Sequence, residues 1–167
     1  MSKLVVAIKN PDQTNFAGWK EYRDREFLQA HDIAFQANLF PLGKKSVDEW
    51  PDHYKNLFGF GKENRSEYEQ IVKNDHFPCL RSAWKDDAPV ITICFGINSW
   101  CDFENLLKLT EAPEEFDNCR LYKNPGVVLT PFFKYRFMPH RRIHGLAEKL
   151  RPFWERRAGA NSPQTDK

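Results

Sequence analysis

The sequence predicts an α/β protein, organised as a three-layer α/β/α sandwich with a mostly parallel central sheet. One observation is the uncharged, β-branched run from Pro89 to Gly96, which is typical of a strand buried on both faces. A second is a pair of shorter apolar runs, Leu4 to Ile8 and Ile33 to Asn38, each of which precedes a proline. A third is the alternation of these runs with segments of helical spacing, which favours strands joined by helices.

Helical spacing marks the segments that join the first runs. Trp19 to Ala30 carries a partial apolar stripe, and Glu63 to Lys73 places its apolar residues on one face. Between them, Ser46 and Glu49 form a capping-box pattern, and Pro51 limits the helix that would follow or moves its start. The first half of the chain is therefore expected to hold two strands and up to three helices.

Further elements follow the central run. Ser99 is expected to cap a helix, whose inner face would consist of Trp100, Phe103, Leu106 and Leu107. Gly126 to Leu129 is expected to be a strand, which breaks at Pro131. Arg141 to Leu150 has apolar residues at helical spacing, and Pro152 is expected to end or kink that helix.

Length and composition indicate one folded domain over residues 1–158, followed by a disordered polar tail over residues 159–167. Aromatic residues make up 14% of the chain, which argues against disorder elsewhere. No stretch reaches the ~18 apolar residues of a membrane span, and the run after Met1-Ser2-Lys3 is too short for a signal peptide. We expect a cytoplasmic protein that meets no membrane, in which four cysteines without C-x-x-C spacing stay reduced, namely Cys79, Cys94, Cys101 and Cys119.

Basic residues are concentrated near the C-terminus. The net charge of the chain is +2, yet Lys134 to Arg157 holds eight cationic and two acidic side chains, a net of +6 that leaves −4 on the remainder. This distribution favours one anion-facing surface on an acidic body. The alternative is an ordinary solvated helix face that is rich in basic residues.

Two asparagines lie near the ends of the predicted N-terminal strands. Asn10 is followed by Pro11, and Asn38 lies three residues before Pro41. Ligands of open α/β sheets bind at the carboxyl ends of strands, and each amide supplies both a donor and an acceptor. The pair is therefore suited to bind a planar polar ligand such as a nucleobase. The alternative is that each asparagine caps its own loop, as asparagine often does in turns.

These motifs resemble those of the uracil-DNA glycosylase superfamily, most closely its mismatch-specific and single-strand-selective branches, over residues 4–153. In those branches the first strand ends in G-x-N-P-G, and a later strand carries aromatic-x-x-N-x-x-P. Here residues 8–12 keep Asn-Pro and replace both glycines, while Phe35 to Pro41 keeps every marked position. The unit from Val90 to Leu107, with Gly96 at its turn, is similar to the family's third strand and the helix after it.

The resemblance implies hydrolysis of the N-glycosidic bond of uracil or a related damaged base that has been turned out of DNA. Asn10 would position the attacking water, and Asn38 would read the edge of the base. Phe16 would stack on the base, and Asp12 is a further candidate for substrate binding, with an ordinary turn residue as the alternative. No cofactor is implied, and the cysteine spacing does not match the iron–sulfur cluster of some branches.

The third family motif, H-P-S-P, corresponds here to Thr130-Pro131, so that Thr130 stands in place of the histidine that assists the departing base. His140 is the second candidate for that role. The segment after Pro131 interleaves aromatic and cationic residues, as in proteins that insert wedges between bases and bind phosphates. The residues expected to contact DNA are Phe133, Lys134, Tyr135, Arg136, Arg141 and Arg142. The alternative is that the aromatic residues of this segment cover the core.

Two other functions are compatible with the same sequence. The replaced motif histidine and glycines favour a superfamily member that has lost glycosylase activity and binds nucleic acid, a nucleotide or a protein. A third interpretation is an α/β domain unrelated to DNA, whose basic helix binds an acidic partner. A metal site is not expected, because His140 and His144 lack a third ligand nearby.

Overall fold

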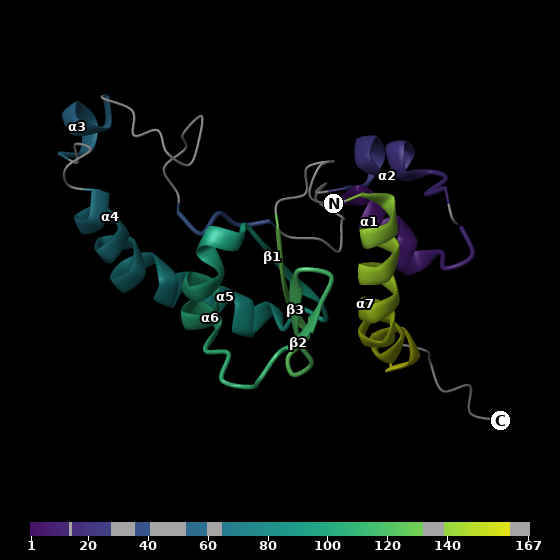
Figure 1. Ribbon diagram of the computed structural model, residues 1–167. Coiled ribbons are helices and arrows are strands. Elements are labelled where there is room, and N and C mark those ends of the chain that lie inside the picture. Colours follow the sequence, from purple (N-terminus) through teal and green to yellow (C-terminus); the bar gives the residue numbers. More distant parts are fainter. Residues whose placement is uncertain (14, 28–35, 41–52, 60–64, 132–138, 161–167) are drawn as a thin grey trace. The chain divides into compact units, whose positions relative to one another are not determined.

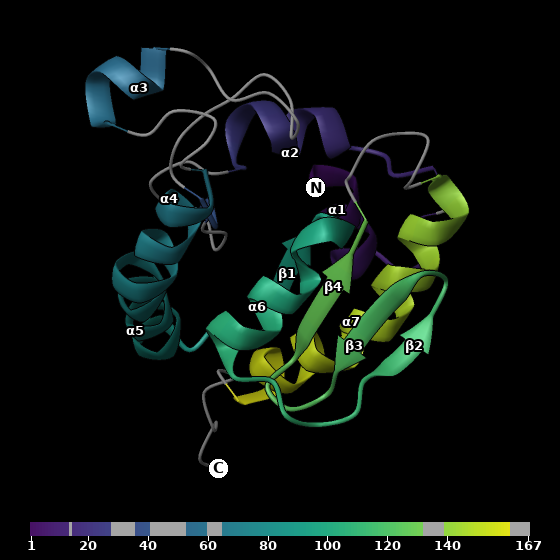
Figure 2. The same ribbon diagram turned by 60° about the vertical axis from the view of Figure 1, so that its left-hand side comes forward.

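The computed structural model describes residues 1–13, 15–27, 36–40, 53–59, 65–131 and 139–160 (Figures 1 and 2). Its helices are α1 (Ser2–Lys9), α2 (Trp19–Arg25), α3 (His53–Phe58), α4 (Arg65–Ile71), the π-helix η2 (Val72–His76), α5 (Phe77–Asp87), the 3-10 helix η3 (Ile97–Ser99), α6 (Trp100–Leu107) and α7 (His140–Ala160). Its strands are β1 (Thr92–Phe95), β2 (Glu114–Phe116), β3 (Cys119–Tyr122) and β4 (Val127–Thr130). The expected α/β class is confirmed.

Contacts group the chain into two compact units. The first unit consists of Met1–Phe35, Pro89–Asn105 and Leu109–Lys167, and the second of Gln36–Ala88 and Leu106–Lys108. The sheet, α1, α2 and α7 belong to the first unit, and α3, α4, η2 and α5 belong to the second. Most of the candidate site residues therefore lie in the first unit.

The sheet has the strand order β1-β4-β3-β2 and is mixed. β1 runs parallel to β4, whereas the β4–β3 and β3–β2 pairs are antiparallel, so a mostly parallel sheet does not describe these four strands. One cause is the two-residue hairpin between β2 and β3, at Asp117 and Asn118, where φ is 45° and 58°. Positive φ at both turn residues matches the twist of the paired strands, and Asp and Asn tolerate that conformation.

Helices pack against both faces of the sheet, as Figure 1 shows for α6 and α7. On one face, α1, α7 and the strands share a core that includes Leu4, Ala7, Ile8, Phe16, Cys119, Leu121, Val128, Ile143, Leu146, Ala147, Leu150 and Phe153. On the other face, Arg120 Nη1 donates to Glu104 of α6 at 3.0 Å, and the Tyr122 hydroxyl donates to the same carboxylate at 2.7 Å. Side chains alternate along β3, so Arg120 and Tyr122 contact α6 while Cys119 and Leu121 lie in the core shared with α7.

The segment Leu4 to Ile8, expected to be a strand, is part of α1. An apolar run of five residues has no period that separates a strand from a buried helix, so flanking contacts decide. Here Leu4, Ala7 and Ile8 have the helical spacing i, i+3 and i+4, and all three are buried in the core that α7 also lines. Burial against α7 therefore selects the helix.

Several other expected elements are present. The central run forms β1, Gly126 to Leu129 forms β4, and the helix after Ser99 forms α6. The helix expected over Glu63 to Lys73 corresponds to α4 and continues into η2 and α5. Of the strand expected over Ile33 to Asn38, residues 36–38 carry no strand and the rest lies outside the described residues, as does the capping box at residues 46–49.

Two helices differ in length from their expected bounds. α2 ends at Arg25, and of its expected range residues 28–30 lie outside the described part of the chain. α7 continues through Pro152 to Ala160, so this proline does not end the helix. Pro152 removes a hydrogen bond to the Glu148 carbonyl, and both residues are exposed, so water can replace that bond. Of the expected tail, residues 161–167 lie outside the described residues.

Candidate nucleic-acid interface

The two motif asparagines are exposed and belong to different units. Asn10 follows the last turn of α1, where its N–H bonds to the Val6 carbonyl at 2.9 Å and its carbonyl accepts from the Gln13 N–H at 3.2 Å. It therefore ends a helix and begins a turn, and it does not end a strand as expected. Asn38 lies in the second unit, where its carbonyl oxygen is 3.2 Å from Nε2 of His76. Each amide side chain is accessible from solvent within its own unit.

Phe16, the residue expected to stack on a base, is a core residue with 0% of its surface exposed. Its ring stacks on the His144 imidazole, with centroids 4.4 Å apart, and meets His140 edge-on at 5.0 Å. Its φ of 53° is left-handed, which costs about 1–3 kcal/mol for a residue other than glycine. Packing of the ring must offset that cost, so the expected stacking of Phe16 on a ligand is wrong.

Two further candidates have different surroundings. Thr130 is 0% exposed in β4, and its hydroxyl donates to the Pro131 carbonyl at 2.7 Å. Its proton is therefore engaged inside the fold, so Thr130 is not placed to assist a leaving base. Asp12 is exposed in the turn after α1, which agrees with its alternative role as a turn residue.

The residues expected to contact DNA are only partly described. Phe133, Lys134, Tyr135 and Arg136 lie outside the described residues. Arg142 is 15% exposed, and its Nε and Nη2 donate to the Asp117 carboxylate at 3.1 Å and 3.3 Å. This guanidinium ties α7 to the β2–β3 turn, and its expected contact with DNA stays a prediction. Arg141, one residue earlier, is exposed in the first turn of α7.

Other cations of α7 are also held inside the first unit. Lys149 donates to the Glu114 carboxylate of β2, Arg151 Nη2 donates to the Ala7 carbonyl at 3.4 Å, and Arg156 Nε donates to the Pro152 carbonyl at 3.2 Å. Much of the positive charge that the sequence concentrates near the C-terminus therefore holds α7 to α1, to β2 and to itself. An anion-binding surface must draw on other residues.

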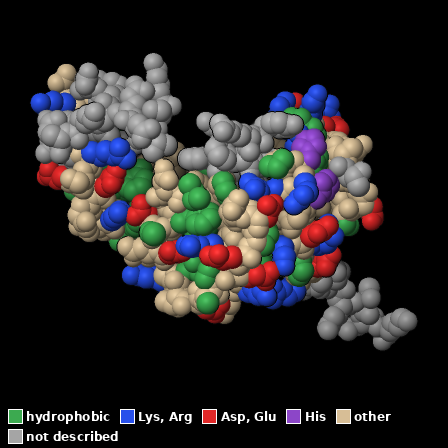
Figure 3. All heavy atoms as spheres, in the orientation of Figure 1, with side chains coloured by type: hydrophobic (Ala, Val, Ile, Leu, Met, Phe, Trp, Pro, Cys, Tyr) green, Lys and Arg blue, Asp and Glu red, His purple; other side chains and the backbone are tan. Residues whose placement is uncertain are grey.

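Cationic side chains also gather on α1, α2 and the start of α7, a region where Figure 3 shows histidine among Lys and Arg side chains. The half-buried Trp19 ring has three cations around its centroid: Lys3 Nζ at 4.8 Å, the Arg23 guanidinium at 5.2 Å and Lys20 Nζ at 6.0 Å. These distances are those of cation–π contacts. Together with Arg141, these four residues are called the basic–aromatic surface below.

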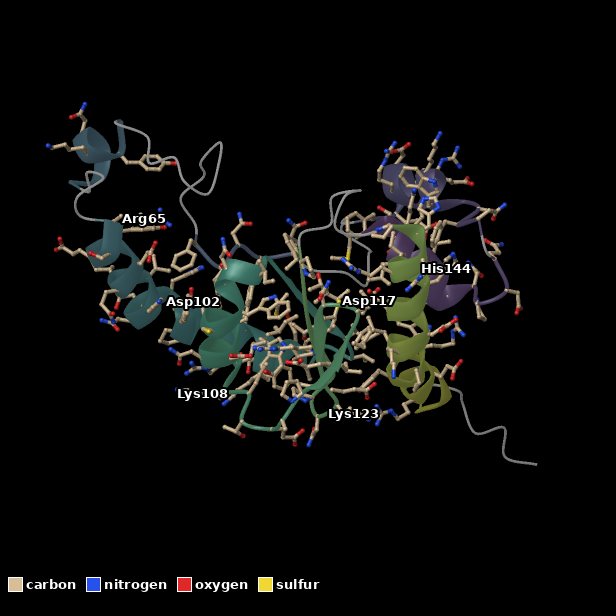
Figure 4. The ribbon with its side chains drawn as sticks, viewed as in Figure 1. Arg65, Asp102, Lys108, Asp117, Lys123 and His144 are labelled. Carbon is tan, nitrogen blue, oxygen red and sulfur yellow. The ribbon has the colours of Figure 1, made fainter. Side chains whose placement is uncertain are left out.

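His140 connects this surface to α7. It is exposed at the first position of the helix, and its Nε2 lies 3.1 Å from Lys3 Nζ. Lys3 also approaches the Phe16 ring, at 5.7 Å from its centroid. One ammonium group therefore contacts residues from α2, from α7 and from the loop between α1 and α2; Figure 4 labels His144, the other imidazole packed on Phe16.

Acidic side chains neutralise part of this surface. Arg23 donates to both oxygens of Asp24, at 2.7 Å and 3.1 Å, and this hydrogen bonding lowers the pKa of the Asp24 carboxyl. Arg25 pairs with Glu21 one turn away. Lys3 and Lys20 are therefore the strongest candidates to bind an incoming anion. Sequence reasoning noted Trp19 only as a helix residue, although Lys20 and Arg23 lie within four residues of it.

The four cysteines are free thiols. Burial raises the pKa of Cys94 to about 12, and burial is also the main reason that the pKa of Cys119 rises to about 11. Both thiols stay protonated and unreactive at neutral pH. Cys79 and Cys101 are exposed.

Within the described residues, no cluster of three or more His, Cys, Asp or Glu side chains is arranged to hold a metal ion. In the same residues, no helix combines the length and the apolar character that a membrane span requires. Comparisons of this chain with protein-family models, with curated protein sequences and with solved structures found no match.

Proposed function

We propose that this protein binds nucleic acid, with DNA as its partner, through the basic–aromatic surface. The observation that carries the proposal is the gathering of Lys3, Lys20 and Arg23 around the half-buried Trp19 ring. Lysine and arginine bind phosphates and release counterions, and aromatic rings beside them provide stacking surfaces for bases. The proposed setting is the cytoplasm, where the free thiols stay reduced.

The contacts on the two faces of the sheet support a three-layer α/β/α arrangement as part of this proposal. The core lies between the sheet and the α1–α7 pair, and Glu104 of α6 binds Arg120 and Tyr122 from the opposite face. In such a fold the basic–aromatic surface belongs to the outer side of one helical layer. The sheet and its core then serve as the scaffold that fixes α1 and α7.

The proposal is tested by measuring the affinity of labelled oligonucleotides, single-stranded and duplex, as salt is raised. In a Lys3→Gln/Lys20→Gln variant, the slope of log affinity against log salt should fall by about 1.8 for duplex, because each lost phosphate contact removes about 0.9. The matched control is Lys85→Gln/Lys108→Gln, which makes the same charge change at exposed lysines outside the basic–aromatic surface. Equal losses in both variants, or binding that does not respond to salt, would contradict the proposal.

A second proposed function is excision of uracil or a related damaged base, which rests on the motif resemblance. The exposure of Asn10 favours it, because an amide that meets a substrate must be accessible. Asn10 would position the attacking water, and the exposed His140 would assist the departing base. The buried Phe16 and Thr130 have no part in this version of the site.

Base release from oligonucleotides that contain uracil, hypoxanthine or a mismatch tests this second function. If the reaction occurs, Asn10→Ala should abolish it and leave salt-sensitive DNA binding in place. Asn15→Ala is a control for loss of an exposed amide in the same loop. Salt-sensitive binding by the wild-type protein without any base release would favour a binding protein that has lost glycosylase chemistry.

A further inference from the structure

Trp19 is held in place at the start of α2 by its backbone and by its ring. Its N–H donates to the Phe16 carbonyl at 3.1 Å, and Gly18 before it has a left-handed φ of 80°, which lets the chain turn directly into the helix. Part of the Trp19 side chain packs against the core of the first unit, and the rest is exposed. A ligand that contacts the exposed part therefore has little side-chain freedom to remove.

The charge beside this ring comes from two helices. Lys3 of α1 lies 4.8 Å from the ring centroid, and Arg23 and Lys20 of α2 lie 5.2 Å and 6.0 Å from it. Arg23 pairs with Asp24, so three cations and one carboxylate leave a net charge of +2 on these four side chains. Each phosphodiester of a nucleic acid carries one negative charge. The charge beside the ring therefore matches two phosphates of a strand.

We propose that the basic–aromatic surface binds single-stranded DNA, with one base stacked on Trp19 and the flanking phosphates on Lys3 and Lys20, an inference that rests on the proposed nucleic-acid binding. Every base has a π face that can stack on an indole ring. A solvent-exposed cation–π contact is weak, whereas a charge-assisted hydrogen bond from an ammonium group to a phosphate is stronger. The lysines therefore move from the ring to the backbone of the strand as the base takes their place.

The accessibility of the bases determines which form of DNA can use the ring. In a duplex each base is paired and stacked between its neighbours, so Trp19 would meet a base only after that base had been turned out of the helix at a cost in free energy. The bases of a single strand are accessible without that cost. Lys3 and Lys20 bind phosphates of either form, whereas Trp19 strengthens binding of the single strand alone.

The experiment separates the effect of the bases from that of the charge. Its probes are a labelled oligothymidylate of about ten nucleotides, an oligomer of the same length and charge whose sugars carry no base, and a mixed-sequence duplex. Its variants are Trp19→Leu, which keeps apolar volume on the core, and Trp19→Phe, which keeps an aromatic ring. Trp84→Leu, at a half-buried tryptophan of the second unit, is the matched control.

We expect wild-type protein and Trp84→Leu to bind oligothymidylate about 5- to 150-fold more tightly than the base-free oligomer, which is the range that stacking of one base provides. Trp19→Leu should lose this difference and keep its affinity for the base-free oligomer and for the duplex, while Trp19→Phe should keep part of the difference. Stacking on a base also quenches indole fluorescence. Oligothymidylate should therefore quench the emission of wild type and Trp84→Leu, and this quenching should be absent from Trp19→Phe.

Each other outcome overturns the proposal. Equal wild-type affinities for oligothymidylate and the base-free oligomer, or an undiminished difference in Trp19→Leu, would overturn the stacking on Trp19 and leave the proposed DNA binding intact. If Trp19→Leu does not fold, Trp19→Phe gives the answer, because quenching that persists in this variant would overturn the stacking as well. A folded wild-type protein that binds none of the three probes would overturn both the stacking and the proposed DNA binding.

Discussion

Phe16 shows how the contacts of a residue decide between two roles for the same side chain. An aromatic residue just after an Asn-Pro motif suits a base-stacking role, yet this ring fills the space between α1 and α7 and touches two imidazoles. Its backbone is left-handed, with φ of 53°, and its ring is fully buried. A core role predicts that replacing Phe16 lowers the stability of the protein, whereas a ligand-binding role predicts a loss of binding at unchanged stability.

Replacing Phe16 with Ala should lower the free energy of unfolding by about 3–5 kcal/mol, the usual cost of deleting a buried phenylalanine. Urea denaturation measures this change, and Phe16→Leu should recover part of it because the cavity is smaller. A variant of unchanged stability that no longer binds DNA would restore the stacking role for this ring.

Gly126, before β4, occupies a position that tolerates no side chain. Its φ is 81°, and an added Cβ would lie 2.6 Å from the Val90 carbonyl oxygen and 3.1 Å from the Phe153 ring. Gly126→Ala should therefore destabilise the protein by at least about 1–3 kcal/mol from backbone strain alone. Gly145→Ala is the matched control: it lies inside α7 with open space around it, and should stabilise by about 0.5–1 kcal/mol. Equal unfolding midpoints for the two variants would contradict this argument.

At the scale of elements, Glu114 links the edge strand β2 to α7. Its carboxylate accepts from Lys149 of α7 and from Lys123, 2.9 Å away, and these hydrogen bonds lower its pKa from the ordinary 4.5 to about 2. Because the folded-state pKa is the lower one, the stabilisation is complete above about pH 4.5 and is lost as pH falls toward about 2.

Glu114→Gln should therefore be less stable than wild type at neutral pH, by a small amount because solvent reaches the carboxylate, whose side chain is 31% exposed, and the difference should shrink toward pH 2. Thermal unfolding across that pH range measures the effect. Glu111→Gln, at an exposed glutamate of the preceding loop, controls for the change in charge. A stability gap that stays constant with pH would show that the ion pairs contribute nothing.

Elements with a strong local pattern were predictable and the others were not. β1 is β-branched and uncharged, and α6 has its apolar residues on one face, so each pattern matches the structure. β2 and β3 read Glu-Glu-Phe and Cys-Arg-Leu-Tyr, which are too short and too charged to indicate strands. Leu4 to Ile8 was misassigned because its helical form depends on α7, which lies more than 130 residues away.

At the scale of the whole molecule, the candidate site was also only partly predictable from the sequence. The sequence indicated an anion-facing surface from the charge of the C-terminal quarter, but Arg142 and Lys149 of that segment bind carboxylates of the first unit. The cations that surround Trp19 come from α1 and α2, and Lys3 reaches the ring only because the fold brings the two helices together. Charge composition thus predicted the kind of surface, while packing determined which residues form it.

The packing of α1 on α7 has a consequence for how the chain folds during synthesis. The apolar face of α1 is synthesised before α7, and its partners Leu146 and Leu150 are made about 140 residues later. Until then Leu4 and Ile8 lack the part of their native core that α7 supplies, so apolar surface stays exposed on the nascent chain. Packing of α7 therefore completes this core, and a chain that stops before residue 140 would leave the apolar face of α1 accessible to chaperones and proteases.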